Sequence, residues 1–210
     1  MSAVPLIFSS GWASGINSYA VVLLLGLLGR YAHMSAVPPT LERTDVLAVC
    51  AVLFLGQFVV GKIPYVDSVW DVIHTAIRPV MGAAVGALMA GHAHTLPQAA
   101  AAAIGGGAAL ATHLVKTGVR VGVNASPEPV SNIVASLAED LGVAGMVVLA
   151  LLHPLAAALI AATLLVVGVI LVIMLAKRIR RAWRRRRERR RQRQAGQSSE
   201  LRIPSAGGHL

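Results

Sequence analysis

The feature that most constrains the fold of this chain is the stretch 155–176, which contains no charged residue. A helix of about 20 apolar residues is long enough to cross the hydrocarbon core of a bilayer. The same character extends over the whole chain: 56% of the residues are hydrophobic and only 13% are charged, whereas about 25% are charged in a typical soluble domain. Because a soluble core of this size cannot bury so much apolar surface, the sequence predicts an integral membrane protein.

More apolar stretches, separated by turns that contain proline or glycine, precede this one. Together they predict an all-α fold, a polytopic bundle of about six transmembrane helices. The expected helices cover residues 11–31, 44–61, 65–90, 97–121, 130–152 and 155–176. Pro79 removes a backbone hydrogen bond from the third helix. It therefore predicts a kink there and leaves open whether that helix is split.

The basic residues are concentrated behind the last predicted span. Residues 177–193 hold 12 of the 19 lysines and arginines, whereas residues 1–176 hold six basic and seven acidic residues. The formal charge of +10 therefore belongs to the C-terminal segment, and the body is nearly neutral. Because cations that directly follow a span mark the cytoplasmic side, we expect both termini of a six-span chain in the cytoplasm. The body is expected to lie in a cell membrane.

This distribution divides the chain into a transmembrane helical domain, residues 1–176, and a basic cytoplasmic extension, residues 177–210, disordered from Gln194 onward. The extension can bind anionic lipid headgroups, and the candidate residues are Arg184, Arg185, Arg186 and Arg187. The alternative is that it only fixes the orientation of the last span. Nucleic acid is not an expected partner, since Trp183 is the only aromatic residue in the basic run. The bilayer itself is the expected partner, and association into homo-oligomers is left open.

Charged and polar residues recur inside three of the predicted spans at helical spacing. The third span carries Asp67, Asp71, His74 and Arg78, the fourth carries His113, Lys116 and Arg120, and the fifth carries Asn132, Ser136, Glu139 and Asp140. Residues three and four apart share one face of a helix. A charge within a span costs about 2.5–3.5 kcal/mol on insertion scales. Each of these groups is therefore expected to be paired or to line a polar cavity.

Groups of opposite sign fall at matching depths when the rise of a helix is applied to the predicted topology. The predicted neighbours are Asp67 and Asp71 with Lys116 and Arg120, and Arg78 with Glu139 or Asp140. Two interpretations of this network stay open. It is either a structural set of ion pairs that fixes helix register, or a binding site or ion path with His74 and His113 as titratable members.

Small and neutral polar residues also occur inside the spans. Asn17 and Ser18 either line the same cavity or hydrogen-bond to a neighbouring helix. Gly82 and Gly86 form a pair of small residues four apart, which suits close helix contact in lipid. The alternative is small-residue packing without a defined partner.

When the sequence is shifted by 90 positions, four identical residues of the two halves align: Gly15 with Gly105, Arg30 with Arg120, Pro39 with Pro129, and Pro64 with Pro154. Three spans per half would make the halves inverted in the membrane, an arrangement common in transporters. Chance alignment of glycine and proline is the competing explanation, so the repeat is one of two open interpretations.

The sequence offers no motif for a known catalytic or cofactor site. Cys50 is the only cysteine, which excludes an intramolecular disulfide, and its apolar surroundings predict a buried, inert thiol. No phosphate-binding loop or metalloprotease spacing is present. His92 and His94 are expected to be plain turn residues. We therefore expect no cofactor, no metal and no catalytic residue, although an intramembrane enzyme that acts on lipid is not excluded.

Three stretches carry a resemblance to a known family: residues 14–19 (SGINSY), residues 62–71 (KIPYVDSVWD) continuing to His74 and Arg78-Pro79, and residues 126–132 (SPEPVSN) with Ala138-Glu139-Asp140. They resemble the bacterial membrane family labelled domain of unknown function 4126. The resemblance covers roughly residues 10 to 176. It implies an integral membrane protein and, as the label says, no established activity.

Two classes of function are compatible with these features. The first is a small-solute or proton-coupled transporter or channel. Its candidate residues are Asn17, Asp67, Asp71, His74, Arg78, His113, Lys116, Arg120, Asn132, Glu139 and Asp140. The second is a non-catalytic membrane scaffold or assembly factor, in which the buried charges only hold the helices together.

Overall fold

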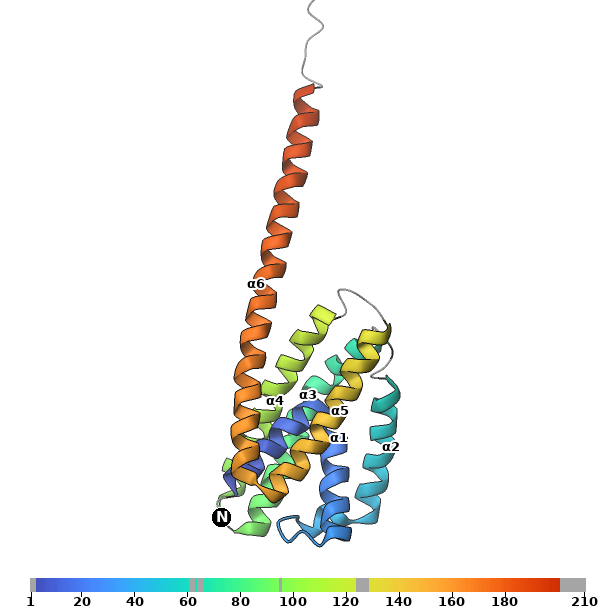
Figure 1. The fold of residues 1–210 in the computed structure, drawn as a ribbon, viewed down its shortest axis with the longest axis vertical. Coiled ribbons are helices and arrows are strands. Elements are labelled where there is room, and N and C mark those ends of the chain that lie inside the picture. Colours follow the sequence, from blue (N-terminus) through green and yellow to red (C-terminus); the bar gives the residue numbers. More distant parts are fainter. Residues whose placement is uncertain (1–2, 61–62, 64–65, 95, 124–128, 201–210) are drawn as a thin grey trace, which may run out of the picture. The chain divides into compact units, whose positions relative to one another are not determined.

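The computed structural model describes the chain apart from residues 1–2, 61–62, 64–65, 95, 124–128 and 201–210 (Figure 1). The side chains at 67–68, 121–123, 129–132 and 182–200 also lie outside the description. The described residues form six α-helices and one 3₁₀ helix: α1 (Val4–Ala32), η1 (Pro39–Glu42), α2 (Thr44–Val60), α3 (Val66–Ala93), α4 (Gln98–Val123), α5 (Pro129–Leu152) and α6 (Pro154–Glu200). The predicted all-α fold with six helices is confirmed.

The helix boundaries differ from the expected ones at a few places. α1 begins at Val4 rather than Gly11, and the 3₁₀ helix η1 was not predicted. Pro79 lies inside α3, which continues as one helix to Ala93, so the third helix is not split. α6 extends to Glu200, and the expected disorder of the C-terminal tail stays a prediction.

The helices have the composition of a multi-pass membrane protein. Among the described residues, five helices are long and apolar enough to cross a bilayer: α1, α3, α4, α5 and α6. α2 is apolar but has only 17 residues. Its outer face exposes Val49, Val52, Leu55 and Val59, each between 59 and 69% exposed. Its inner face buries Leu47, Cys50 and Gln57, so the predicted burial of the Cys50 thiol is confirmed.

The chain divides into two compact units, and the boundary between them falls inside α6. The first unit, residues 1–170, contains α1 to α5 and the beginning of α6, and the second, residues 171–210, contains the rest of the chain. The basic extension belongs to the second unit. Its assignment as a separate cytoplasmic segment stays a prediction.

Within the first unit, α1 is the central helix. In its most apolar window 72% of the residues are buried, compared with 39% for α4, and it contacts α2, α3, α4 and α5. Its core side chains include Ile7, Val21 and Leu25, all fully buried. A helix that is apolar around its whole circumference is expected in such a central position.

Glycines bring α1, α3 and α4 into close contact around Gly105. A Cβ atom added at Gly11 of α1 would lie 2.5 Å from the Gly105 carbonyl oxygen, and one at Gly82 of α3 would lie 2.7 Å from the same atom. A Cβ at Gly86 would similarly meet the carbonyl oxygen of Ala101 at 2.5 Å. The pair Gly82 and Gly86 therefore has a defined partner, α4, as expected for small residues at helix contacts in lipid.

The central helix α1 is broken at Asn17, whose backbone torsions (φ −150°, ψ 91°) are not helical. Before the break, Ile7 lies near Gly86, beside Ala101 at the beginning of α4. After the break, the chain reaches Ser35, whose carbonyl oxygen accepts a hydrogen bond from His92 near the end of α3 (2.9 Å). Both ends of α1 therefore lie toward the α3–α4 junction, as Figure 1 also shows, and Asn17 is the apex of a helix that folds back.

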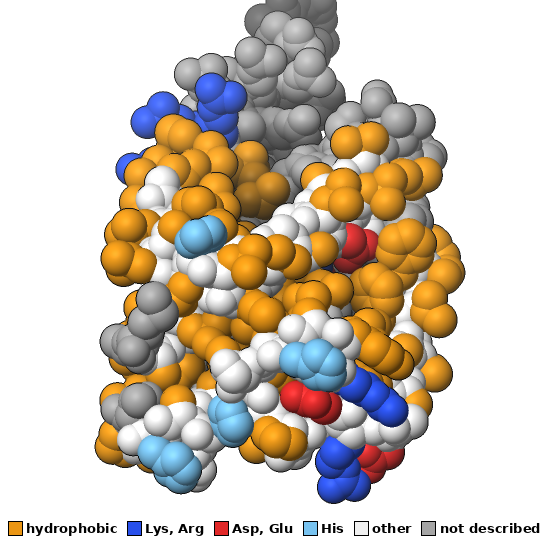
Figure 2. All heavy atoms as spheres, turned by 60° about the horizontal axis from the view of Figure 1, so that its bottom comes forward, with side chains coloured by type: hydrophobic (Ala, Val, Ile, Leu, Met, Phe, Trp, Pro, Cys, Tyr) orange, Lys and Arg blue, Asp and Glu red, His pale blue; other side chains and the backbone are white. Residues whose placement is uncertain are grey.

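The end of the first unit at which α1 begins and ends has a polar surface. Figure 2 shows histidine and charged side chains gathered there, with hydrophobic side chains covering the surrounding surface. The exposed residues of this end are Arg30, His33, Arg43, Asp45, His92 and His94. A polar end above apolar sides is the pattern expected where a helix bundle leaves a bilayer.

Candidate functional site

The break in α1 begins a second helical segment that Asn17 caps. The Asn17 side-chain oxygen accepts a hydrogen bond from the backbone N–H of Ala20 (3.1 Å), the geometry of an N-cap three residues before the donor. The Asn17 amide nitrogen donates to a carboxylate oxygen of Asp140 on α5 (3.1 Å). Asn17 is 1% exposed, so it ties the apex of α1 to α5 deep inside the bundle.

The same break frees two backbone carbonyl oxygens, because residues on the far side of Asn17 no longer bond back to them. The Gly15 oxygen accepts a hydrogen bond from Arg78 Nη1 (3.2 Å), and the Ile16 oxygen accepts one from Lys116 Nζ (3.0 Å). The Ile16 oxygen also accepts a hydrogen bond from the side-chain amide nitrogen of Gln57 on α2 (3.5 Å). Two buried cations thus bind the unwound part of α1.

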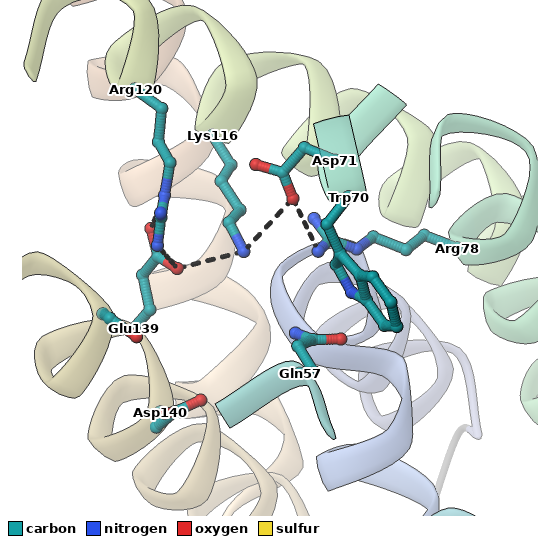
Figure 3. Close-up of a pocket in the computed structure, with 9 residues that line it drawn as sticks. Gln57, Trp70, Asp71, Arg78, Lys116, Arg120, Glu139 and Asp140 are labelled. Carbon is teal, nitrogen blue, oxygen red and sulfur yellow. Dashed lines mark hydrogen bonds and ion pairs between the residues drawn. The ribbon is translucent and has the colours of Figure 1, made fainter. Parts of the chain in front are cut away.

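Around this apex, charged side chains of α3, α4 and α5 form a continuous series of ion pairs (Figure 3). Arg78 Nη2 lies 2.9 Å from Asp71 Oδ1, and Lys116 Nζ lies 3.8 Å from the same oxygen. Lys116 also lies 3.0 Å from Glu139 Oε2. Arg120 donates to both carboxylate oxygens of Glu139, at 3.1 and 2.8 Å. The signs alternate along the series, and Lys116 connects its two halves.

The predicted neighbours within the described side chains lie around one small cavity, although the ion pair of Arg78 differs from the expected one. Asp71 does lie near Lys116. Arg78, however, pairs with Asp71 of its own helix rather than with Glu139 or Asp140. Asp71 is seven residues before Arg78 on the same face of α3, and long side chains in a helix point back toward its N-terminus. Glu139 is bound instead by Lys116 and Arg120 of α4.

His113 is held in one neutral tautomer by its neighbours. Arg78 can only donate, so His113 Nδ1 must accept the hydrogen bond between them (2.7 Å). Thr75 donates its hydroxyl proton to the Asp71 carbonyl oxygen and therefore accepts from His113 Nε2–H (3.0 Å). In this arrangement His113 is a neutral acceptor for Arg78, and its role as a titratable group stays a prediction.

His74 has a hydrogen-bond partner at each ring nitrogen. Its Nδ1 faces the Trp70 carbonyl oxygen at 2.8 Å and must donate to it. Its Nε2 lies 3.0 Å from the Tyr19 hydroxyl oxygen, and in the neutral ring it accepts the hydroxyl proton. The Trp70 ring stacks on the imidazole, with centroids 4.6 Å apart. His74 thus joins α3 to the second segment of α1.

A small polar cavity of about 10 Å³ lies among these groups, and Figure 3 shows its lining. Its volume suits about one water molecule. The buried polar atoms of lining residues that have no hydrogen-bond partner among the described residues include Trp70 Nε1, Arg78 Nε, Asp71 Oδ2 and Gln57 Oε1. Two of them donate and two accept, which matches the two lone pairs and two protons of water.

Most of the predicted site residues meet in this network: Asn17, Asp71, His74, Arg78, His113, Lys116, Arg120, Glu139 and Asp140. The side chains of Asp67, Asn132, Arg184, Arg185, Arg186 and Arg187 lie outside the described ones. Ser18 does not reach a neighbouring helix, since its hydroxyl donates to the Ser14 carbonyl (2.7 Å). No group of three metal-ligating side chains is found among the described residues.

Sequence reasoning missed Gln57, Trp70, Tyr19 and Thr75 as members of the network. Gln57 carried a signal, because it is the one polar side chain in the apolar stretch from Val46 to Val60 apart from Cys50. The carbonyl groups of Gly15 and Ile16 had no signal of their own. They became ligands for cations only because α1 is broken.

Comparisons with known proteins give one match. A family model with the description domain of unknown function (DUF4126) matches residues 4–174. Neither the curated proteins nor the solved structures contain a match to the chain.

Proposed function

The chain belongs to the family described as domain of unknown function 4126, and for this member we propose transport of protons or a small polar solute through the centre of the bundle. The observation that carries the proposal is the broken helix α1. Its freed carbonyl oxygens, at Gly15 and Ile16, lie against the buried cations Arg78 and Lys116. Helices interrupted in this way form the binding sites of many transporters.

The buried charges support the same proposal. Ionisable groups inside a membrane are costly, and they commonly mark ion or substrate pathways. Here Arg78 is fully buried, and Asp71 and Arg120 are 3 and 5% exposed. The cavity of about 10 Å³ beside them accepts water but no larger solute. On this proposal the described arrangement is a closed state, and passage of a solute requires the ion pairs around Lys116 to separate.

The fold-back of α1 suggests a membrane topology for the proposal. If both ends of α1 lie on one side, α2 to α6 make five crossings, α2 being near the shorter limit of about 17 residues. The basic residues 177–193, in the second half of α6, assign the C-terminus to the cytoplasm. The N-terminus then lies on the outer side, in place of the expected cytoplasmic one. The inverted repeat is not part of this proposal, because α1 is broken whereas α4 is one continuous helix.

Flux measurements on protein in liposomes test the transport proposal. Proton entry is followed with a pH-sensitive dye, and small anions and cations are followed as radioisotopes. Asp71→Asn and Lys116→Met should remove the flux, since each breaks the series of ion pairs. Asp45→Asn is the matched control, because Asp45 pairs with Arg43 at the exposed surface. Liposomes with folded wild-type protein that are no more permeable than empty ones would overturn the proposal.

A scaffold or assembly factor is the second candidate function. It is favoured by the close pairing of Glu139, which receives two hydrogen bonds from Arg120 and lies 3.0 Å from Lys116. Such a set of ion pairs fixes the positions of helices without any ligand. On either proposal the chain is not an enzyme. The scaffold proposal predicts that Asp71→Asn changes stability but that neither this variant nor the wild type supports flux.

A further inference from the structure

A second cavity lies beside the polar one, between α1, α4, α5 and the first part of α6, and its volume is about 190 Å³. Its apolar walls are formed by Trp12, Ile16, Val115, Val119, Leu164 and Leu165. Leu164 is 46% exposed on the outer surface of the bundle, where the bilayer lies. The cavity is therefore a lateral pocket whose walls suit hydrocarbon.

The floor of this lateral pocket is polar. Lys116 and Glu139 line both the lateral pocket and the small polar cavity, so their ion pair separates the two spaces. Thr112 also lines the pocket. Its hydroxyl is buried without a hydrogen-bond partner among the described residues. A ligand that enters along the apolar walls thus meets a cation and a hydroxyl at the bottom.

The hydrogen-bond donors at the floor favour a ligand that carries an acceptor group. Glu139 already receives two hydrogen bonds from Arg120, so its charge is compensated without Lys116. The ammonium group of Lys116 has three protons. Its close partners are the Ile16 oxygen and Glu139 Oε2, both at 3.0 Å, while Asp71 Oδ1 lies at 3.8 Å, beyond hydrogen-bond distance. One donor of Lys116 remains for a ligand.

We propose that the lateral pocket binds a single-chain carboxylate amphiphile, a fatty acid, with its carboxylate on Lys116 and Thr112 and its hydrocarbon chain between Trp12 and Leu165. The volume supports one chain rather than a two-chain phospholipid, since pockets for drug-sized ligands measure about 300–1,000 Å³ and this one is smaller. The proposal is independent of transport, because the lateral pocket and the small polar cavity are different spaces that share only Lys116 and Glu139.

Quenching of tryptophan fluorescence tests this proposal in nanodiscs of neutral phosphatidylcholine. The probe is bromine-labelled dodecanoate, which quenches Trp12 when its chain enters the pocket. Bromine-labelled dodecanol and dodecyltrimethylammonium are matched probes with the same chain and a neutral or cationic head. We expect saturable quenching by the carboxylate, with an affinity about tenfold higher than that of the alcohol, the effect of one charge-assisted hydrogen bond. The quenching should disappear in Trp12→Phe.

Two variants separate the head from the chain. Lys116→Gln should remove the preference for carboxylate over alcohol but keep the quenching, whereas Leu165→Phe should narrow the pocket and abolish saturable binding of both. Arg43→Gln, at the exposed surface, should bind as the wild type does. Equal affinity of the wild-type protein for the three heads would overturn the proposal, and so would displacement of the probe by an anionic phospholipid but not by unlabelled dodecanoate. These wild-type measurements decide the outcome even if a variant fails to fold.

Discussion

Arg78 donates a hydrogen bond to Nδ1 of His113 across 2.7 Å, and both side chains are fully buried. A histidine in this position cannot carry a second proton without losing its bond to the guanidinium group. The guanidinium group of Arg78 therefore has two acceptors, the neutral imidazole of His113 on α4 and the carboxylate of Asp71 on α3. It also predicts how substitutions at position 113 rank.

His113→Asn should be tolerated better than His113→Leu. An asparagine side chain can still present an oxygen to Arg78, whereas leucine leaves a buried charged donor without its partner. Hydrogen bonds to charged groups are worth about 1.5–3 kcal/mol, so the leucine variant should be less stable than the asparagine variant by about this amount. Thermal unfolding in detergent, followed by tryptophan fluorescence, measures the difference. Equal stability of the two variants would contradict an acceptor role for His113.

The Asp71–Arg78 pair should show strong coupling in a double-mutant cycle. Breaking a buried ion pair by removal of one partner costs about 3–5 kcal/mol, because the other charge is left uncompensated. Asp71→Leu and Arg78→Met should each destabilise strongly, and the double variant should be less destabilised than the sum of the two. The control cycle uses the exposed pair Arg43 and Asp45. Additive effects at 71 and 78 would show that the pair is not coupled.

Gly105→Ala and Gly107→Ala should have opposite effects although they lie on the same helix. A methyl group at Gly105 would collide with the backbone of Gly82, whereas no atom lies within 4 Å of a Cβ at Gly107. Alanine favours a helix over glycine by about 0.5–1 kcal/mol, so Gly107→Ala should be neutral or stabilising. Gly105→Ala should destabilise by about 1–3 kcal/mol through overpacking. Both changes are read from the same unfolding curves.

Loss of the Asn17 cap at the apex of α1 should lower the stability of the protein. Asn17→Ala removes both the bond to the Ala20 N–H and the bond to Asp140. We expect a loss of about 1–2 kcal/mol for the cap and a further loss from the broken hydrogen bond to Asp140. Asn17→Asp keeps the cap but places a second carboxylate next to Asp140. It should therefore not restore wild-type stability, whereas Ser18→Ala, which removes only a bond within α1, serves as the mild control.

Cysteine labelling tests the proposed fold-back of α1 in the membrane. In a Cys50→Ser background, single cysteines replace Ala36, Ala93 or Ala195. Ala36 and Ala93 are exposed, and each is one residue from the hydrogen-bonded pair Ser35 and His92. An impermeant maleimide added outside intact cells should label both positions, and Ala195→Cys only after permeabilisation. Labelling of positions 36 and 93 from opposite sides would exclude the fold-back.

The sequence could predict the part of the site that depends on helical periodicity. Asp71, His74 and Arg78 share one face of α3 because they are three and four residues apart, and that face is the buried one in the structure. The same holds for His113, Lys116 and Arg120 on α4. The assignment of Arg78 to Glu139 failed, because depth along a helix does not determine which of several opposite charges a long side chain reaches.

The amino-acid sequence by itself determined that this protein lies in a membrane, that it is built from six helices, and which polar residues face inward. These properties follow from local apolar length and from spacing along one helix. Only the tertiary structure decided that α1 breaks at Asn17 and folds back, so that backbone oxygens become partners of Arg78 and Lys116. The reason is that the position of α1 depends on contacts between distant residues, such as Gly11 with Gly105, which no local pattern specifies.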